Sequence, residues 1–348
     1  MAKKVLVLGG GKMGQVIARD LSRTYQVKIA DINEAVCDIS LDISSANKIE
    51  IKDLFNKFDL IIGALPSQLG HRPLKHAAEN GNNYVDLSFS AQSPDYLDSI
   101  ARKSGSIILH DCGLSPGLSN LIAGNLNRIY KPSFITIMVG GISQNPDAVY
   151  GHVNTWCPKD LREEYTRSAR FILDGKEKYL NPLDSRFWSK HKFDEIGELE
   201  GFISDGLRSL LKLKGPDTIS EITLRRKGHL KQVRKLIGEN KFVKEIEEKC
   251  SKGKDTVILQ VECDNATVIM VDKQKDKISS MARTTAYSCS AFAKLILKDK
   301  WKNTGVYAPE DISTAWPVAY HNCYHFVVQE LLKHNIVIKE KINSRKVH

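Results

Sequence analysis

Three glycines near the start of the chain have the spacing of a phosphate-binding turn. Gly9, Gly11 and Gly14 follow the apolar run 5–8 and lead into helical apolar spacing, which matches the G-x-G-x-x-G pattern. Gly9 lets the chain reverse, Gly11 lets backbone N–H groups approach a pyrophosphate, and Gly14 lets the helix pack on the strand. The helix N-terminus then favours the negative phosphates. We expect these residues of the turn to contact a dinucleotide: Gly9, Gly11, Lys12, Met13 and Gly14.

An acid follows the second apolar run, which covers residues 27–30. Asp31 lies close to the ~20 positions after the last glycine at which a ribose-binding acid is expected. A carboxylate there hydrogen-bonds the adenosine ribose and repels a 2′-phosphate. Residues 32–35 offer no Arg or Lys that would accommodate that phosphate. The sequence therefore favours NAD over NADP; the alternative is a glycine turn that binds no nucleotide.

Polar or small residues follow three further apolar runs, at 60–63, 84–87 and 106–109. In an open parallel sheet, ligands bind at the carboxyl ends of the strands. We therefore expect the following residues at these ends to line the ligand site: Ala64, Leu65, Pro66, Asp86, Ser88 and Asp111. For Asp86 and Asp111, a capped strand end or a ribose contact remains the alternative to a catalytic role.

The elements that position these residues alternate between strand and helix. Six predicted strands, which are the five runs above and one in a βα crossover at 37–52, alternate with helices. They indicate an α/β fold with a doubly wound parallel sheet of the Rossmann type. The alternation of strands and helices ends at Pro116 and Gly117, and we place a domain boundary near the helix that follows. Beyond it the pattern is that of an α+β domain, with strands expected at these ranges: 134–142, 149–155, 219–224, 255–263 and 266–272. Helices at 280–297 and 320–333 would then return to the first domain.

Composition is that of an ordinary globular protein. The chain has 348 residues, 42% of them hydrophobic and 26% charged, which suggests two domains. No apolar stretch approaches the ~18 residues of a membrane span. The seven cysteines include no C-x-x-C pair, so we expect neither a disulfide framework nor a metal site. With no hydrophobic leader before the first strand, we expect a cytoplasmic protein.

The formal net charge is +10. Two explanations of this excess of basic residues are possible: a nucleic-acid-binding surface, or an ordinary solvated surface that is rich in lysine and arginine. The dense basic runs are confined to 225–227 and 339–348, and no RNA-binding or helix-turn-helix signature accompanies them. We therefore expect no nucleic-acid partner; such a surface would also attract an anionic dinucleotide.

Several segments together carry a resemblance to a known family. Residues 111–120 resemble the D/E-x-G-x-x-P-G junction of the saccharopine dehydrogenase superfamily. The segments 163–167, 202–209 and 223–229 are similar to its NAD-dependent L-lysine 6-dehydrogenase branch, and 279–285 is similar to the start of that branch's return helix. The resemblance covers almost the whole chain.

The resemblance implies an architecture and an activity. It implies a Rossmann NAD-binding domain of residues 1–118 plus 283–348, with an inserted substrate-binding and dimerisation domain of residues 119–282. A homodimer is the implied assembly. The implied reaction is oxidative deamination of the ε-amine of L-lysine, which gives 2-aminoadipate 6-semialdehyde and reduces NAD.

That chemistry assigns roles to the polar residues. An amine must be neutral before it is oxidised, so a general base is needed; the candidates are Asp86, Asp111, His229 and Tyr165. Arginine binds a carboxylate through two parallel hydrogen bonds, and Arg225 and Arg167 are the candidates for that clamp. Asp205 is the candidate for the α-ammonium. For each residue the alternative is a structural role as a cap, an ion pair or a packed side chain.

Two departures from the lysine branch leave other functions open. Arg226 and Lys227 stand where that branch has an aromatic residue and a proline, and Ser168 stands where it has another proline. One alternative is a saccharopine-type dehydrogenase, which acts on a secondary amine between two amino acids. Arg226 and Lys227 would then serve its additional carboxylates. The second alternative is a non-catalytic NAD(H)-binding protein.

Overall fold

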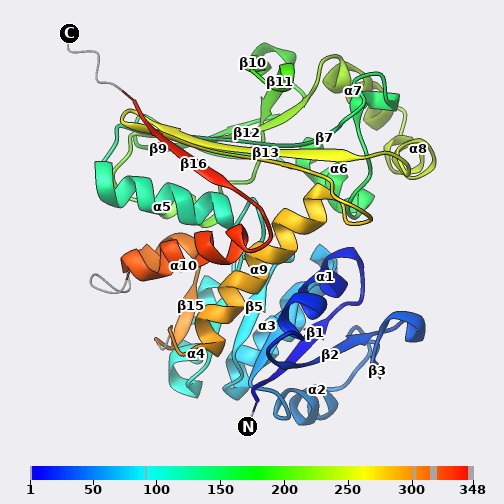
Figure 1. Cartoon of the computed structure of the whole chain (residues 1–348), viewed down its shortest axis with the longest axis vertical. Coiled ribbons are helices and arrows are strands. Elements are labelled where there is room, and N and C mark those ends of the chain that lie inside the picture. Colours follow the sequence, from blue (N-terminus) through cyan, green and yellow to red (C-terminus); the bar gives the residue numbers. More distant parts are fainter. Residues whose placement is uncertain (1, 91, 301–302, 314–319, 344–348) are drawn as a thin grey trace. The chain divides into compact units, whose positions relative to one another are not determined.

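The chain forms two compact units, each built from two separate stretches of sequence (Figure 1). The computed structural model describes residues 2–90, 92–300, 303–313 and 320–343. The units comprise these segments: Met1–Leu121 and Arg283–Asn335 in unit 1, and Ile122–Ala282 and Ile336–His348 in unit 2.

Unit 1 is built on a seven-stranded sheet in which all neighbouring strands are parallel. The order is β15-β6-β5-β4-β1-β2-β3, which confirms the predicted doubly wound Rossmann fold. It reverses beside β1, and such a reversal places a ligand site at the carboxyl ends of the strands. The strands are β1 (Lys4–Leu8), β2 (Gln26–Asp31), β3 (Ile39–Ser40), β4 (Leu60–Gly63), β5 (Tyr84–Asp86), β6 (Ile107–Leu109) and β15 (Gly305–Tyr307).

The helices of unit 1 pack on the sheet through their apolar faces. The core beneath α2, α3 and α4 joins Leu6 and Leu8 of β1 to Phe55, Leu74 and Ala101. All five side chains are almost fully buried, and this burial is what fixes the strands under the site. The helices of this unit, apart from α9, are α1 (Lys12–Leu21), α2 (Lys48–Phe55), α3 (Ser67–Asn80), α4 (Asp98–Ser104) and α10 (Tyr320–Leu332).

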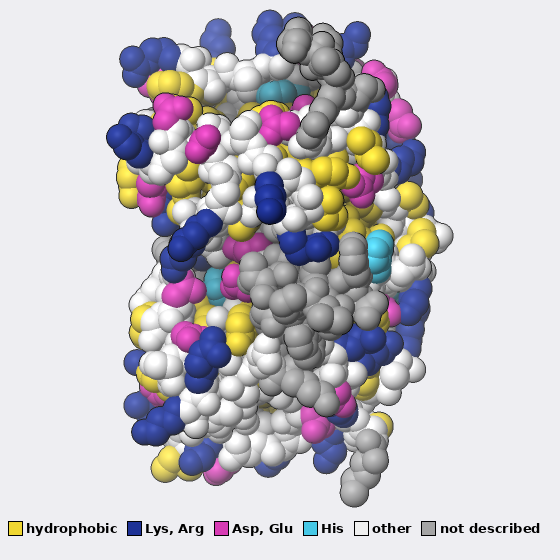
Figure 2. Space-filling model, turned by 90° about the vertical axis from the view of Figure 1, so that its left-hand side faces the viewer, with side chains coloured by type: hydrophobic (Ala, Val, Ile, Leu, Met, Phe, Trp, Pro, Cys, Tyr) yellow, Lys and Arg dark blue, Asp and Glu magenta, His cyan; other side chains and the backbone are white. Residues whose placement is uncertain are grey.

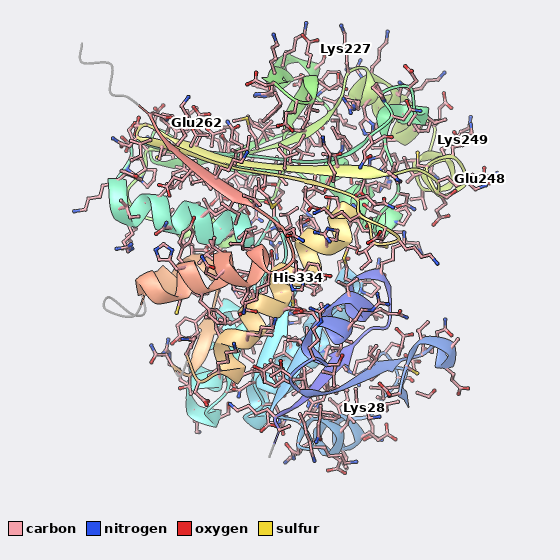
Figure 3. The ribbon with its side chains drawn as sticks, viewed as in Figure 1. Lys28, Lys227, Glu248, Lys249, Glu262 and His334 are labelled. Carbon is pink, nitrogen blue, oxygen red and sulfur yellow. The ribbon has the colours of Figure 1, made fainter. Side chains whose placement is uncertain are left out.

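A buried lysine ties three of the helices together. Helix α9 (Ser280–Leu297) carries Lys294, whose Nζ lies 2.8 Å from Asp20 of α1 and 2.9 Å from Glu330 of α10. His334, labelled in Figure 3, lies 3.0 Å from the other oxygen of Asp20. Although burial opposes it, the hydrogen bonds from His334 and Lys294 lower the pKa of Asp20 to about 2. The network therefore holds α1, and with it the glycine turn, against the C-terminal helices.

Unit 2 contains a nine-stranded, mostly antiparallel sheet with α5 along one face (Figure 1). Its main path is β10-β11-β12-β7-β13-β14-β16, with β8 and β9 attached through β12. The strands are β7 (Phe134–Ser143), β8 (Ala169–Leu173), β9 (Lys176–Leu180), β10 (Ser189–Phe193), β11 (Gly197–Ile203), β12 (Thr218–Arg226), β13 (Asp255–Cys263), β14 (Ala266–Lys273) and β16 (Ile338–Ile342). The helices are α5 (Leu118–Tyr130), α6 (Pro158–Thr166), α7 (His229–Gly238) and α8 (Phe242–Lys249).

The strand predicted at 149–155 is wrong. Val149–Gly151 forms a 3₁₀ turn in which Tyr150 has φ 56° and Gly151 has φ 60°. Two consecutive left-handed residues reverse the chain instead of extending it. Conversely, the four strands β8–β11 were not predicted: β9, β10 and β11 are charged with weak alternation, and β8 is only five residues long, so none shows a clear strand period.

The prediction that everything after residue 283 belongs with the Rossmann sheet is wrong at its end. Strand β16 pairs antiparallel with β14 in the sheet of unit 2, with Ile338 opposite Met270 and Ile342 opposite Ala266. The Lys-Glu-Lys centre of β16 carries no helical or strand periodicity strong enough to reveal this pairing.

Charged side chains of both signs are interspersed on the face drawn in Figure 2, as expected for a solvated basic surface. Within the described ranges, no helix combines the length and the apolarity that a bilayer span requires. The seven cysteines are free thiols.

Candidate functional site

The glycine turn has the tight geometry that a dinucleotide requires. Gly9 has φ +100°, and a Cβ there would lie 2.4 Å from the carbonyl oxygen of Ala64. A Cβ on Gly14 would lie 1.9 Å from the carbonyl oxygen of Gly9, whereas a Cβ on Gly11 would meet nothing within 4 Å. The turn is therefore packed from within at Gly9 and Gly14 and open at Gly11, where a pyrophosphate would approach. These residues fit the dinucleotide that the sequence motif implies.

Asp31 lies directly beside this turn. Its carboxylate accepts hydrogen bonds from the backbone N–H groups of Gly10, at 2.6 Å, and Asn33, at 2.8 Å. The end of β2 thereby fixes the carboxylate at the turn, in the position expected of a ribose-binding acid. Lys12 and Met13 form the first turn of α1.

The exit of β4 runs against the glycine turn. The backbone N–H of Ala64 donates to the carbonyl of Leu8 at 2.8 Å. The chain therefore stays beside the end of β1 after Leu8 and Gly63, the last residue pair of the two strands. Pro66 then precedes the first residue of α3. Cofactor contact by Ala64, Leu65 and Pro66 stays a prediction.

A buried polar cluster occupies the ends of β5 and β6; we call Asp86, Ser88, His110 and Asp111 the strand-end group. All four are at most 4% exposed. The hydroxyl of Ser88 donates to Asp86 Oδ2 at 2.5 Å, and His110 Nδ1 lies 3.1 Å from Asp111 Oδ2. The predicted strand-end residues of unit 1 are thus brought together.

Burial and neighbouring charges shift the titration of this group. Burial, reinforced by the charge of Asp111, raises the pKa of Asp86 to about 7, against the hydrogen bond from Ser88. His110 behaves in the opposite way: although burial opposes it, Asp111 and Asp95 raise its pKa to about 10. An acid that changes charge near neutral pH beside a permanently charged imidazolium suits proton transfer.

His110 is a site residue that the sequence analysis missed. It directly precedes Asp111 at the end of an apolar run, and that adjacency is the signal that would have found it. Asp111 itself has φ 55°, a left-handed conformation that costs energy for a residue with a side chain. The chain accepts this cost at the point where the two side chains meet.

In unit 2, Tyr165 and Arg225 join His229 and Glu164 in a second buried cluster, which we call the arginine network. Arg225 Nε donates to the Tyr165 hydroxyl at 2.8 Å, and its terminal nitrogens donate to the Leu224 carbonyl and to Glu164. Three of the five guanidinium N–H groups are thereby used within the chain. The Arg225 side chain is 5% exposed, and it is not the surface ion pair that was the alternative.

The hydrogen bonds also assign the tautomer of His229. Its Nδ1 lies 2.6 Å from the carbonyl oxygen of Tyr150, so this nitrogen carries the proton and Nε2 accepts from the Tyr165 hydroxyl at 2.8 Å. Burial, together with the charge of Arg225, lowers the pKa of His229 to about 3. Burial raises that of Tyr165 to about 12. These shifts favour a structural role for both groups over the predicted role as general base, and their catalytic role stays a prediction.

Asp205 has partners that were not expected. The Arg170 side chain donates two hydrogen bonds to it, at 2.7 Å and 3.0 Å, and the Arg170 backbone N–H a third at 3.3 Å. Arg167 Nη1 lies 3.9 Å away. A carboxylate held in this way by arginines is a poor receptor for an ammonium group. These contacts favour a structural role for Asp205, in which it holds Arg170; binding of the α-ammonium by Asp205 stays a prediction.

Arg226 and Lys227 are likewise engaged elsewhere. Arg226 donates to the backbone carbonyls of Ser143 and Ile196. Lys227 points outward in Figure 3; its side chain is 78% exposed and lies 3.6 Å from Glu198. Neither side chain is arranged as the additional carboxylate receptor that the saccharopine-type alternative assigned to it.

A parallel sheet with such a glycine turn defines a dinucleotide-binding protein of the Rossmann class. Comparison with known families carries this further. The family model for the saccharopine dehydrogenase C-terminal domain matches residues 113–336, and that for the saccharopine dehydrogenase NADP binding domain matches residues 5–109. The chain therefore belongs to the saccharopine dehydrogenase family.

The curated relatives match this chain over only part of their own length. Rat mitochondrial alpha-aminoadipic semialdehyde synthase is 25% identical over 192 residues, which cover 50% of this chain and 21% of that protein. The Saccharomyces cerevisiae saccharopine dehydrogenase [NADP(+), L-glutamate-forming] is 22% identical over 213 residues, which cover 56% of this chain and 47% of the relative. The chain thus spans less than half of each.

Two solved structures share the fold. The apo saccharopine dehydrogenase (L-Glu forming) from Saccharomyces cerevisiae has a TM-score of 0.78 at 18% identity, covering 98% of this chain and 100% of the other. The homospermidine synthase from Legionella pneumophila, solved in complex with NAD, has a TM-score of 0.68 at 12% identity, covering 100% and 94%. The family model that matches residues 5–109 indicates a nicotinamide dinucleotide cofactor.

Within the described ranges, no three His, Cys, Asp or Glu side chains are grouped as ligands of a metal ion.

Proposed function

We propose that this protein is an NAD-dependent oxidoreductase that acts on a CH–NH group of an amino acid. The leading candidate reaction is oxidative deamination of the ε-amine of L-lysine to 2-aminoadipate 6-semialdehyde. One observation carries the proposal: Asp86, a buried acid with a pKa of about 7, ends a strand of the same sheet as the glycine turn. A dehydrogenase of amines needs a base of this strength at the carboxyl edge.

Asp86 is the residue to which we assign the general base. Its ionised carboxylate takes a proton from the substrate ammonium, and Ser88 orients it through the hydrogen bond to Oδ2. Asp111 and the His110 imidazolium set the local charge. When bound, a nicotinamide supplies the hydride acceptor, and the residues of the chain supply orientation and proton transfer.

Asp31 supports NAD as the cofactor. The carboxylate is fixed at the glycine turn by two backbone N–H groups, so it cannot swing away from a 2′-phosphate without losing both hydrogen bonds. Like charges in such proximity oppose NADP binding. The matching family model and the yeast relative carry NADP in their names, and the Kd values of this chain for NAD and NADP decide between the two cofactors.

Arg167 is the residue to which we assign the substrate carboxylate. It lies in unit 2, its side chain is 17% exposed, and a guanidinium can bind a carboxylate through two parallel hydrogen bonds. Arg225 instead supports Tyr165 and α6 from within the arginine network. We assign it a positioning role.

A saccharopine-type reaction is the second candidate, and the names of the relatives favour it. The yeast relative is named a saccharopine dehydrogenase that forms L-glutamate. On that proposal the secondary amine of saccharopine replaces the ε-amine of lysine, and Asp86 keeps its role.

An activity screen separates these candidates. NAD and NADP reduction are measured with L-lysine, L-saccharopine and other amino acids, and the reverse reaction with ammonia or with an amino acid and a 2-oxo acid. Reduction of NAD by lysine alone supports deamination, and reduction by saccharopine supports the second candidate. Tight NAD binding without turnover of any amine would contradict both and leave a non-catalytic binding protein.

We also propose that the protein forms a homodimer, as its family resemblance implies. Light scattering of the purified chain would test this, because a monomeric mass at micromolar concentration contradicts it.

A further inference from the structure

A turn at the carboxyl edge of the unit 1 sheet is held by an arginine from another helix. Residues 41–46 lie between β3 and α2, and we call them the β3–α2 turn. Arg72 of α3 donates through Nη1 to the backbone carbonyls of Ile43, at 3.0 Å, and Ser44, at 2.5 Å. Its Nη2 donates to the carbonyl of Ala46. One guanidinium thus holds three carbonyls of a single turn.

The same turn is also fixed from within. The carboxylate of Asp42 accepts hydrogen bonds from the backbone N–H and the hydroxyl of Ser44, at 2.9 Å and 2.6 Å. The hydroxyl of Ser45 donates to it at 2.8 Å. Ile43 and Ala46 are each 6% exposed and pack into the core beneath α2, α3 and α4. The turn is therefore ordered, although both of its serines are exposed.

The β3–α2 turn begins beside the residue to which we assign the adenosine ribose. Strand β3 runs parallel to β2, with Ser40 opposite Asp31, and the backbone N–H of Leu41 donates to the Asp31 carbonyl at 3.0 Å. In a doubly wound sheet, each half of the sheet binds one half of the dinucleotide. A ribose held by Asp31 therefore brings the adenosine to the ends of β2 and β3, where this turn lies.

The stability of the fold is a weak explanation for the three hydrogen bonds of Arg72. Its side chain is exposed, and water competes for the same donors and carbonyls, so the net gain in folding free energy is modest. What the three bonds restrict is the freedom of the turn. A ligand that binds against a loop loses less free energy when that loop is already ordered.

We propose that Arg72 is a positioning residue of the cofactor site, which holds the β3–α2 turn as a wall of the subsite for the adenosine half of the dinucleotide. Arg72 acts through the turn, because both of its terminal nitrogens are engaged by the carbonyls. The inference rests on the adenosine role proposed for Asp31, and it does not depend on which amine is oxidised.

The test compares the two halves of the cofactor. The Kd values of NAD and ADP are measured by calorimetry, and that of nicotinamide mononucleotide by NMR titration, in wild type and Arg72→Ala. We expect the Kd values of NAD and ADP to rise about tenfold, which corresponds to about 1.4 kcal/mol. The Kd of the mononucleotide should stay unchanged, because it binds to the other half of the sheet.

Arg102→Ala is the matched control. Arg102 is an arginine of the same unit that donates to Asp98 and to the carbonyl of Thr304, the residue before β15. It therefore lies at the amino edge of the sheet, opposite the ligand edge. Its loss should leave the Kd values of all three ligands unchanged.

Two further variants separate position from charge. Arg72→Lys keeps the charge but offers no planar fork to the carbonyls, so we expect it to bind ADP more weakly than wild type. Asp42→Ala frees the same turn from within while it removes a negative charge. Loss of that charge alone would strengthen the binding of ADP, whereas loss of the order of the turn weakens it, and we expect weaker binding.

Four results would overturn the proposal: unchanged ADP affinity in Arg72→Ala, an equal loss of affinity for the mononucleotide, full recovery in Arg72→Lys, or tighter ADP binding by Asp42→Ala. The lysine and Asp42 variants decide the matter if Arg72→Ala does not fold. Wild-type protein that binds neither NAD nor ADP would contradict the proposed cofactor site and this inference with it. If wild type binds both and Arg72→Ala binds them equally well, only the role of Arg72 fails.

Discussion

The strand-end group of unit 1 and the arginine network of unit 2 are both buried and polar, yet their chemistry differs. In the arginine network, Arg225 and His229 have hydrogen-bond partners at each nitrogen, and their pKa values are displaced away from neutrality. In the strand-end group, Asp86 keeps one oxygen unpartnered among the described residues and titrates at about 7. A saturated network stabilises the fold, whereas an incompletely satisfied one with an intermediate pKa is suited to function.

The largest expected effect of this difference is on turnover. Asp86→Asn removes the proposed base while it preserves shape, and we expect kcat to fall by roughly 10²- to 10⁴-fold, the usual contribution of a general base. Asp53→Asn, an exposed acid on α2, is the matched control. Affinity for NAD, measured by calorimetry, should stay within a few-fold. A kcat within threefold of wild type would remove Asp86 from the mechanism.

The next effect is on stability and falls in unit 2. Arg225→Ala leaves the partly buried Glu164 without its cation and Tyr165 without a donor. Breaking a fully buried ion pair typically costs about 3–5 kcal/mol, which is the upper bound for this pair. We expect the urea midpoint of unfolding to fall accordingly. Arg234→Ala, which removes an exposed arginine of α7 stacked on Trp188, should cost less than about 1 kcal/mol. Equal losses in the two variants would show that the arginine network is not what stabilises unit 2.

A smaller effect concerns cofactor choice. Asp31→Ala removes the charge that opposes a 2′-phosphate, and we expect the ratio of the Kd values for NADP and NAD to fall by roughly 10- to 100-fold, or about 1.4–2.7 kcal/mol. Because the carboxylate also accepts from Gly10 and Asn33, Asp31→Asn is the milder companion variant. Wild-type protein that binds NADP as tightly as NAD would contradict the role given to Asp31.

The sequence predicted the Rossmann unit better than the second unit, for a physical reason. Buried parallel strands such as β1 and β4 are nearly continuous apolar runs, and glycines with steric tasks, such as Gly9 and Gly14, leave a visible spacing. Strands β9 to β11 are short and carry charged residues, and the apolar part of β8 is only three residues long, so none of the four stands out from a loop. Strand β16 is specified by its partner β14 and not by its own residues.

Site residues were predictable by type, and their partners were not. Asp86, Tyr165 and Arg225 were singled out by position and chemistry, but sequence spacing cannot reveal that Glu164 neutralises Arg225 or that a backbone carbonyl fixes the tautomer of His229. Those contacts arise from the packing of α6 and α7 on β12. They decide which residues can act as bases at neutral pH.

The last effect is the pH dependence of the unfolding free energy. It separates the two regions because His229 and His110 change stability with pH in opposite directions. His229 has its pKa lowered to about 3, so the unfolded chain binds the extra proton between pH 3 and the ordinary value near 6.5, and stability falls as pH decreases through that window. His110 has its pKa raised to about 10, so its contribution is complete below about pH 6.5 and declines as pH rises toward 10.

Each histidine contributes at most about 1.4 kcal/mol per pH unit, the value for one proton. We therefore expect His229→Gln to flatten the acid side of a plot of unfolding free energy against pH, and His110→Gln to flatten the alkaline side. The half-buried His71 serves as the comparison: burial lowers its pKa, so His71→Gln should flatten the acid limb less than His229→Gln does and leave the alkaline limb unchanged. If His110→Gln left the alkaline limb intact, the imidazolium beside Asp111 would not be the charge that the strand-end group depends on, and Asp86 would have to be tuned by burial alone.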